Sequence, residues 1–181
     1  MNGLVTYGSA YGSTQKYAQW IAEELSFDIK AAEEADGAML ARYDIIIHGG
    51  GLYAGGVKGI QVITKNYASI AHKPVILFTC GLADPEDQEN VVHIEAGLAK
   101  VLSPEMQKHI KLFHFRGGID YSRLGLVHRA MMAMLRKSML RKGRDNLRQE
   151  DKLMLDTYGK KVDFTDRQMI APLIEYVKQI G

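Results

Sequence analysis

The eight residues from Tyr7 to Thr14 (Tyr-Gly-Ser-Ala-Tyr-Gly-Ser-Thr) bring small, flexible and hydroxyl-bearing side chains together in one short segment. They follow a predicted strand at residues 3–7 and lead into a predicted helix at residues 15–25. The first N–H groups of a helix lack intrahelical partners and the helix dipole is positive at that end, so this position attracts an anion. Ser9, Ser13 and Thr14 can add hydroxyl donors. The segment therefore predicts a phosphate-binding loop.

The spacing within this loop narrows the class of phosphate. The loop has no Gly-x-x-x-x-Gly-Lys pattern, and Gly8 and Gly12 do not fit Gly-x-Gly-x-x-Gly. Triphosphates and dinucleotides are therefore disfavoured, and a monophosphate neutralised by amides and hydroxyls without a cation is favoured. The alternative is a serine-rich helix cap and tight turn that binds nothing.

Two other glycine-rich segments also follow predicted strands. Residues 49–59 contain six glycines in eleven residues, so their backbone can approach a flat ligand while Tyr53 offers an aromatic face. Residues 79–84 (Thr-Cys-Gly-Leu-Ala-Asp) form the other segment. For residues 49–59, a flexible surface loop is the alternative.

Hydrophobic periodicity indicates the elements that position these segments. Apolar runs predict strands at residues 3–7, 28–32, 43–48, 73–80 and 110–116. The runs 43–48 and 73–80 are continuously apolar, which is typical of central strands covered on both faces. Spacings of three and four residues predict helices at 15–25, 59–71, from 84 toward 102, at 124–142 and near the C-terminal end.

Local signals indicate where two of these helices begin. The sequence Asp84-Pro85-Glu86-Asp87 predicts an N-cap with proline at the first helical position. Thr165 and Gln168 predict a capping box before the final helix. Pro172 interrupts that helix, so we expect a kink or a later start there.

Five strands that alternate with helices predict an α/β fold, a doubly wound parallel sheet with helices on both faces. Ligands of such sheets bind outside the carboxyl ends of the strands, where the strand order reverses. Because the three glycine-rich segments all follow strands, we expect them to meet at one rim of the sheet.

Composition limits the class of protein. The 181 residues are enough for one domain with its own core. A single cysteine, Cys80, excludes an internal disulfide, and the N-terminal residues lack a secretory signal pattern; both favour the cytoplasm. No apolar run reaches the roughly 18 to 20 residues of a membrane-spanning helix. None of the six histidines has a partner at metal-ligand spacing, so we predict no metal site.

Positive charge is concentrated in residues 123–148. This segment holds eight basic residues and one acidic residue, a net charge of +7; the whole chain carries +2, so the remainder carries −5. Such a block suggests an anionic partner: lipid headgroups, nucleic acid, or an acidic protein or substrate. A solvated helix face is the alternative.

The predicted helix 124–142 within this segment is amphipathic. Arg129, Arg136 and Lys137 share one side, and the opposite arc is apolar, formed by Leu124, Val127, Met131, Met134, Leu135 and Met139. A methionine-rich face opposite a basic face is typical of a helix lying on an anionic membrane surface. Packing of the arc against the body of the domain is the alternative, and the two are compatible if only part of the arc packs.

The first loop, Ser9-Ala10-Tyr11-Gly12-Ser13-Thr14, resembles the phosphate loop of the flavodoxin family, Ser/Thr-x-Thr-Gly-x-Thr, with Tyr11 in place of a threonine. The resemblance covers residues 1 to about 116 and the last helix. It implies the strand order 2-1-3-4-5 and the cofactor FMN, with its phosphate on the first loop and its isoalloxazine ring between the second and third segments. The residues that it implies in cofactor binding are Ser9, Ala10, Tyr11, Gly12, Ser13, Thr14, Gly51, Leu52, Tyr53, Ala54, Gly55, Cys80, Gly81, Leu82 and Asp84.

Residues 115–123 and 161–166 are similar to the flavodoxin-like menaquinone-dependent protoporphyrinogen IX dehydrogenases, in which a basic, aromatic-rich insertion follows the fifth strand. Here Asp120-Tyr121-Ser122-Arg123 and Arg129-Ala130-Met131-Met132 occupy those places, and the basic helical insertion covers residues 117–160 of a single domain, 1–181. The resemblance implies an FMN-dependent oxidoreductase that passes electrons from a reduced organic substrate to a quinone at the inner face of the membrane. It assigns no catalytic residue.

Two other functions remain open. A flavodoxin-type electron carrier would exchange electrons with redox proteins, although such carriers are usually strongly acidic and this chain carries +2. A nucleic-acid-binding module would use residues 123–148. That segment has little of the aromatic interleaving that stacks bases, so we expect no nucleic-acid partner.

Overall fold

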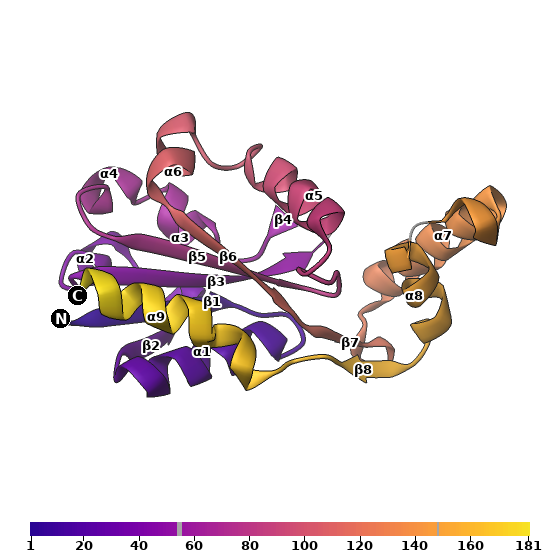
Figure 1. The fold of residues 1–181 in the computed structure, drawn as a ribbon, viewed down its shortest axis with the longest axis horizontal. Coiled ribbons are helices and arrows are strands. Elements are labelled where there is room, and N and C mark those ends of the chain that lie inside the picture. Colours follow the sequence, from indigo (N-terminus) through magenta and orange to yellow (C-terminus); the bar gives the residue numbers. More distant parts are fainter. Residues whose placement is uncertain (54–55, 148) are drawn as a thin grey trace.

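A parallel sheet forms the centre of the computed structural model, which describes residues 1–53, 56–147 and 149–181. Its parallel strands are β1 (Gly3–Gly8), β2 (Asp28–Ala31), β3 (Ile45–Tyr53), β5 (Val75–Gly81) and β6 (Lys111–Arg116). They lie in the order β2-β1-β3-β5-β6, and the short strand β4 (Gly56–Val57) pairs antiparallel with the end of β3. The doubly wound α/β fold and its strand order are confirmed (Figure 1).

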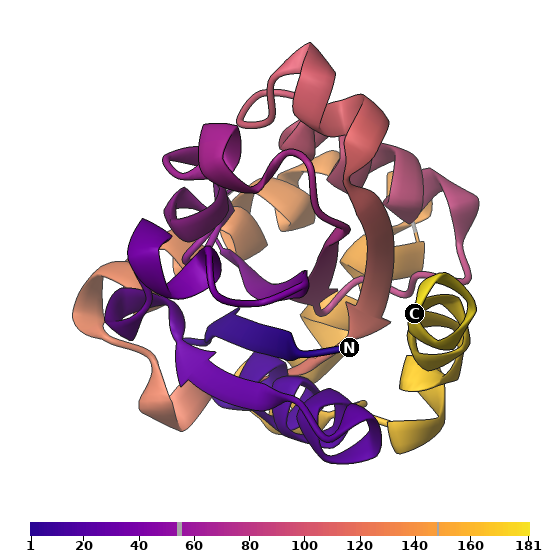
Figure 2. The ribbon, with the colours of Figure 1, turned by 90° about the vertical axis from the view of Figure 1, so that its left-hand side faces the viewer.

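Helices cover both faces of the sheet (Figure 2). One face carries α1 (Ser13–Leu25) and α9 (Ala171–Ile180). The other carries α2 (Gly37–Leu40), α3 (Gln61–Thr64), α4 (Tyr67–Ile70), α5 (Gln88–Leu98) and α6 (Pro104–His109), with the 3-10 helix η1 (Ala32–Glu34) after β2. Strand residues alternate between the two cores: Val5 and Ile47 pack with Tyr17 of α1, whereas Leu4 and Ile46 face the opposite way.

Two helix boundaries in the first half differ from those expected. Residues 59–71 form α3 and α4 instead of one helix. The Asn66 side-chain amide donates a hydrogen bond to the Val62 carbonyl at 2.9 Å, and this bond ends α3. Helix α5 begins at Gln88 and not after Asp84. The Asp87 carboxylate accepts the Glu89 N–H and caps α5, so the expected N-cap at Asp84 is wrong.

The final helix has a different cap but the expected late start. The 3-10 helix η4 (Arg167–Ile170) is capped by Asp166, whose carboxylate accepts the Gln168 N–H. The capping box at Thr165 is therefore wrong, since the Thr165 hydroxyl is engaged by Asp163 at 2.7 Å. Helix α9 then begins at Ala171 with Pro172 in its first turn.

The glycines of the second segment are partly strand and not loop. Strand β3 continues to Tyr53, so Gly49 and Gly50 pair with β1 on one side and β5 on the other, and Gly51 pairs with β5. A Cβ at Gly49 would collide with the ring of Phe78, and a Cβ at Gly50 would collide with Val57. These glycines therefore make room for side chains of the two cores.

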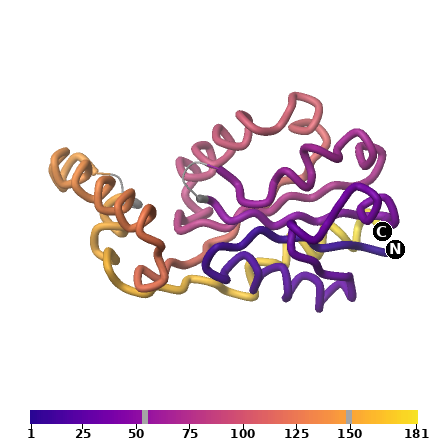
Figure 3. Tube along the Cα trace, turned by 180° about the vertical axis from the view of Figure 1, so that it is seen from behind, coloured from indigo at the N-terminus to yellow at the C-terminus, as the bar shows by residue number. Residues whose placement is uncertain are grey.

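A helical lobe, residues 118–163, projects beyond the carboxyl end of the sheet (Figures 1 and 3). Its base is an antiparallel pair of strands, β7 (Gly118–Asp120) and β8 (Lys161–Asp163). Between them lie the 3-10 helix η2 (Tyr121–Arg123), α7 (Leu126–Lys142), the 3-10 helix η3 (Arg144–Asn146) and α8 (Gln149–Thr157). The helix expected at 124–142 is confirmed as α7, and Arg136 on it stacks over the Tyr158 ring at 4.9 Å, beyond the end of α8.

A buried histidine makes the stability of this fold depend on pH. His48 of β3 is fully buried, and its Nε2 lies 3.3 Å from the Lys58 carbonyl, which can only accept. Nε2 therefore carries the proton, and Nδ1 accepts the Thr6 hydroxyl at 2.9 Å. A protonated ring would be a buried charge, so burial lowers the pKa of His48 from 6.5 to about 4.

We expect the free energy of unfolding to fall as the pH drops from about 6.5 to about 4, by up to about 3 kcal/mol from His48. The sign follows because the unfolded chain binds the proton at higher pH than the folded one. Urea unfolding at several pH values should show a shallower pH dependence in His48→Gln. The matched control His72→Gln replaces an exposed histidine and should keep the wild-type slope; equal slopes in all three proteins would contradict the assignment.

Candidate functional site

The three glycine-rich segments meet at one cavity of about 480 Å³ at the carboxyl ends of the strands. The first loop contributes Ser9, Ala10, Tyr11, Ser13 and Thr14; the second segment contributes Gly51 and Leu52; the third contributes Cys80, Gly81 and Leu82. The helical lobe closes the opposite side with Gly117, Gly118, Ile119, Leu124, His128, Met131, Met132, Leu135 and Met154, of which Gly117 immediately precedes β7.

The remaining predicted residues lie elsewhere or outside the described part of the chain. Gly12 is the N-cap of α1, at a φ of 99° that glycine adopts without strain. Asp84 binds Arg116 through a 2.6 Å ion pair at the rim and does not line the cavity. Ala54 and Gly55 fall outside the described residues, and Tyr53 ends β3. A group of three or more side chains suited to a metal ion is absent from the described residues.

The first loop offers a donor set that fits a phosphate monoester. No described side chain caps helix α1, so its first N–H groups are left for a ligand at the positive end of the helix. Ser9 and Ser13 bring hydroxyls to the cavity, and Thr14 is buried at 3% exposure. Lys58, which sequence reasoning missed, donates its ammonium to the Ser9 carbonyl at 3.0 Å. A cation therefore lies beside the first loop, although Lys58 does not line the cavity.

Cys80 has a packing role in the wall of the cavity. Burial raises the pKa of its thiol to about 12, although a hydrogen bond with Thr14 acts in the opposite direction. The thiol is 5% exposed and stays protonated near neutral pH. A protonated thiol is a poor nucleophile, so these features favour a packing role for Cys80 in the cavity wall.

The apolar side of α7 is divided between the cavity and the solvent. Met131 and Leu135 line the cavity, and Met139 is buried at 6% exposure. Val127 and Met134 point outward and are 70% and 67% exposed. Only part of the apolar arc expected from sequence therefore packs, because the lobe contacts one side of that arc and leaves the other side exposed.

Two other lining residues, Gly117 and Gly118, could have been predicted from the sequence. Gly117 and Gly118 form a fourth glycine segment after a parallel strand, β6. A Cβ at Gly117 would lie 2.7 Å from the Cys80 sulfur, and a Cβ at Gly118 would collide with the Val162 carbonyl. This pair lets the base of the lobe pack against the third segment. His128, Met132 and Met154 carried no such signal, since only the path of the lobe brings them to the cavity.

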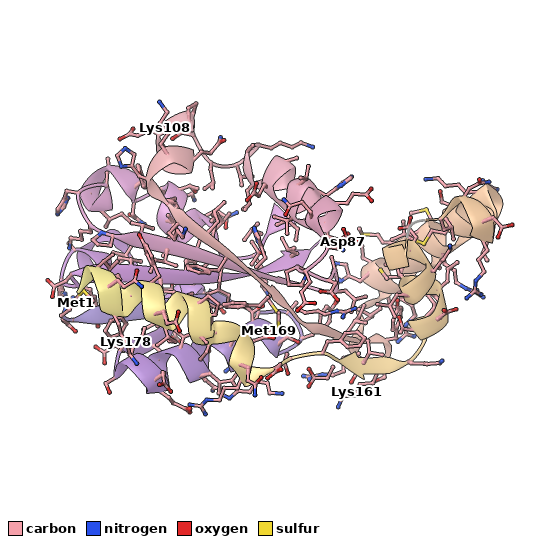
Figure 4. All side chains as sticks on the ribbon, in the orientation of Figure 1. Met1, Asp87, Lys108, Lys161, Met169 and Lys178 are labelled. Carbon is pink, nitrogen blue, oxygen red and sulfur yellow. The ribbon has the colours of Figure 1, made fainter. Side chains whose placement is uncertain are left out.

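Helix α1 holds both ends of the lobe in place. The Ser13 hydroxyl accepts the Gly118 N–H at 3.2 Å. The Tyr17 hydroxyl donates to the Arg116 carbonyl at 2.7 Å and accepts the Asp166 N–H at 3.1 Å. Burial raises the pKa of Tyr17 to about 12, so the hydroxyl keeps its proton. Figure 4 labels Lys161 at the base of the lobe and Asp87 at the end of the body that faces the lobe.

The comparisons with known proteins agree with this geometry. The sequence model of the flavodoxin domain (Flavodoxin_5) matches residues 4–147, and the chain belongs to this family. FMN is the cofactor of flavodoxins and therefore of this protein, and the donor set of the first loop fits its phosphate. No curated protein sequence matches the chain.

Several solved structures are similar in fold at low identity. Oxidised flavodoxin 1 from Bacillus cereus shares 16% identity over 64% of this chain and 84% of its own, with a TM-score of 0.42. Oxidised flavodoxin 2 from Bacillus cereus shares 22% identity over 63% and 84%, with a TM-score of 0.42. A flavoprotein in complex with FMN from Lactobacillus acidophilus shares 16% identity over 64% and 91%, with a TM-score of 0.39. The family assignment rests on the domain match.

Removing two hydroxyls from the first loop tests the phosphate position. Ser9→Ala combined with Thr14→Ala should weaken FMN binding at least tenfold, since each lost partner of a buried anion costs roughly 1 to 3 kcal/mol. Fluorescence titration of the apoprotein measures this affinity. Riboflavin lacks the phosphate and is the control, so its affinity should change far less. Equal losses for both ligands would place the phosphate elsewhere.

Removing the Tyr17 hydroxyl tests the attachment of the lobe. Tyr17→Phe leaves the Arg116 carbonyl and the Asp166 N–H without this partner, which should lower the free energy of unfolding by about 1 to 3 kcal/mol. Trypsin should also cut the lobe faster. Tyr43→Phe is the matched control, because its hydroxyl bonds Asp28 at an exposed position; its effect should stay below about 0.5 kcal/mol. A Tyr17→Phe protein as stable and as protease-resistant as the control would refute the attachment.

Proposed function

We propose that the chain is an FMN-dependent oxidoreductase that passes electrons from a reduced organic substrate to a quinone, in the manner of the menaquinone-dependent protoporphyrinogen IX dehydrogenases. The supporting observation is the apolar wall that the helical lobe places opposite the cofactor loops. Met131, Met132, Leu135 and Met154 line the same cavity as the first loop. Methionine side chains adapt to the shape of flat apolar ligands, and a concave apolar site of this size suits a small organic molecule.

FMN, when bound, supplies reversible one- and two-electron transfer. The side chains of the chain itself have simpler tasks. The first loop binds the phosphate, and the Cys80 thiol stays neutral beside it. Leu52, Leu82 and the methionines of the lobe exclude water from the cavity. These groups provide no acid or base, so their roles are binding and orientation.

Membership in the flavodoxin family supports an electron carrier equally well. The two functions differ in what must reach the flavin. A carrier requires a protein partner, whereas the proposed enzyme requires a small molecule inside the cavity. The wall of the lobe favours the enzyme, and quinone kinetics separate the two.

Anaerobic mixing of the photoreduced FMN-loaded protein with menadione tests the proposal. We expect flavin reoxidation, followed by absorbance, to saturate with quinone concentration. Met132→Glu places a carboxylate in the apolar wall and should lower the second-order rate at least about tenfold, which corresponds to about 1.4 kcal/mol. Leu140→Glu on the outer side of α7 is the matched control and should keep the rate. Slow, unsaturable reoxidation that neither variant changes would favour the electron carrier.

We also propose that the outer side of α7 docks on an anionic lipid surface, where a quinone acceptor is dissolved. Leu126 is 84% exposed, Val127 is 70% exposed and Met134 is 67% exposed. Exposed apolar side chains of this size are unusual in such density on one helix. Helix α7 contains no acidic residue, and its basic residues include Arg129 and Lys137. Apolar groups that insert and cations that bind headgroups together suit an anionic membrane surface.

No helix in the described ranges is long and apolar enough to span a bilayer. Each Lys or Arg near an anionic surface contributes about 1 kcal/mol. We therefore expect co-sedimentation with anionic liposomes at low ionic strength, little with neutral liposomes, and release by salt. Replacing Arg129, Arg136, Lys137 and Arg141 with Gln should abolish it and leave FMN binding intact. A wild-type protein that ignores anionic liposomes at low salt would disprove the docking.

A further inference from the structure

Lys58 connects the first loop to the central strand β3 through three hydrogen bonds. Its N–H donates to the Gly51 carbonyl at 3.0 Å. Its carbonyl accepts the His48 Nε2–H at 3.3 Å, and its ammonium donates to the Ser9 carbonyl at 3.0 Å. Gly51 and His48 both belong to β3, whereas Ser9 belongs to the first loop. One residue therefore joins the loop to the strand.

The backbone around Lys58 is closely packed. A Cβ at Gly8, the last residue of β1, would collide with the Lys58 carbonyl. Gly59 has a φ of 78°, a conformation that glycine adopts without strain. A Cβ at Gly59 would lie 2.8 Å from the Cβ of Ala32 and 3.1 Å from the ring of His48. These contacts hold the Lys58 carbonyl against the His48 ring.

His48 is the buried end of this connection. Its side chain is fully buried, and the Thr6 hydroxyl lies 2.9 Å from its Nδ1. Thr6 belongs to β1, the strand that leads into the first loop. The orientation of the His48 ring is therefore set from β1 on one side and by the Lys58 carbonyl on the other.

The bond from Lys58 also orients a peptide group of the first loop. Lys58 lines a second cavity of about 480 Å³ and not the cofactor cavity, whereas Ala10 lines both. The Ser9 carbonyl is directed to the Lys58 ammonium. The peptide between Ser9 and Ala10 is trans, so its C=O and N–H point in opposite directions. The Ala10 N–H therefore points away from Lys58.

We propose that Lys58 is a positioning residue for the FMN phosphate: it holds the Ser9 carbonyl so that the Ala10 N–H stays directed at the phosphate, and His48 holds Lys58 in place. A loop that is already fixed in its bound conformation loses less entropy when the ligand binds. The first loop benefits from this restraint because Gly8 and Gly12 give its backbone a wide conformational range.

Replacing Lys58 tests the role of its ammonium. Lys58→Met keeps the aliphatic stem and removes the donor. Fluorescence titration of the full-length apoprotein should show a Kd for FMN at least about tenfold higher, and a Kd for riboflavin that changes less than about twofold. The matched control is Lys65→Met, which removes the same charge from an exposed position outside both cavities. It should keep both affinities.

A pair of variants at His48 separates orientation from charge, since neither changes the net charge at pH 7.5. His48→Leu removes the hydrogen bond to the Lys58 carbonyl and should raise the Kd for FMN at least about threefold. The amide of His48→Gln can donate in place of Nε2–H, so this variant should stay within about twofold of the wild type. Neither variant should change the affinity for riboflavin.

The Ala10 amide reports the orientation directly. In ¹⁵N-labelled wild-type protein its proton resonance should move downfield when FMN is added and less when riboflavin is added; in Lys58→Met this difference should be lost. Unchanged FMN affinity in Lys58→Met, or equal losses for FMN and riboflavin, would overturn the proposal. So would a loss that disappears at about 1 M salt, because Lys58 would then act only as a screened charge. A loss in Lys58→Met without any loss in His48→Leu would refute the part assigned to His48. These titrations contain no substrate, so their outcome is independent of the proposed oxidoreductase.

Discussion

The Tyr17 hydroxyl joins the two chain segments that lead into and out of the helical lobe. It donates to the carbonyl of Arg116 and accepts the N–H of Asp166, and its side chain is fully buried. The ring packs against Trp20 and Phe115, at centroid distances of 5.4 and 4.9 Å. Because Tyr17 belongs to α1, the helix that begins at the phosphate loop also fixes the path of both segments. This buried contact therefore helps to hold the wall of the cavity in place.

The sheet was predictable because its signals are local. Continuous apolar runs identified β3 and β5 as central strands, and each is buried on both faces as that pattern requires. The loops at their carboxyl ends followed from the topology. Strand β3 nevertheless runs through three glycines that the sequence pattern assigned to a loop. Position 49 requires glycine because a Cβ there would collide with the ring of Phe78, a residue of another strand. No local sequence pattern contains that information.

The helices also differ from the predictions where the outcome depends on residues distant in the sequence. Asp84 has the sequence context of an N-cap, yet its carboxylate forms an ion pair with Arg116 at the end of β6. Asp87 caps α5 instead. On α7 the helical wheel gave one apolar arc, whereas the fold divides it between the cavity and the solvent. Periodicity identifies apolar positions but not the direction from which a partner comes. The body side of the candidate site was therefore predictable, whereas on the lobe side only the glycine pair 117–118 and part of the apolar arc carried a signal.

The Ser13 hydroxyl connects these two sides. It lines the cofactor cavity and accepts the N–H of Gly118, the first residue of the lobe. Gly118 also packs closely against β8, since a Cβ there would collide with the Val162 carbonyl. The phosphate loop and the base of the lobe are thus tied through one hydroxyl on a rigid helix end. An enzyme gains rate when substrate and cofactor are held in one fixed relation. A protein that only exchanged electrons with partner proteins would have no need to fix an apolar wall against its cofactor loop in this way, and this is the strongest structural reason to favour a small-molecule substrate.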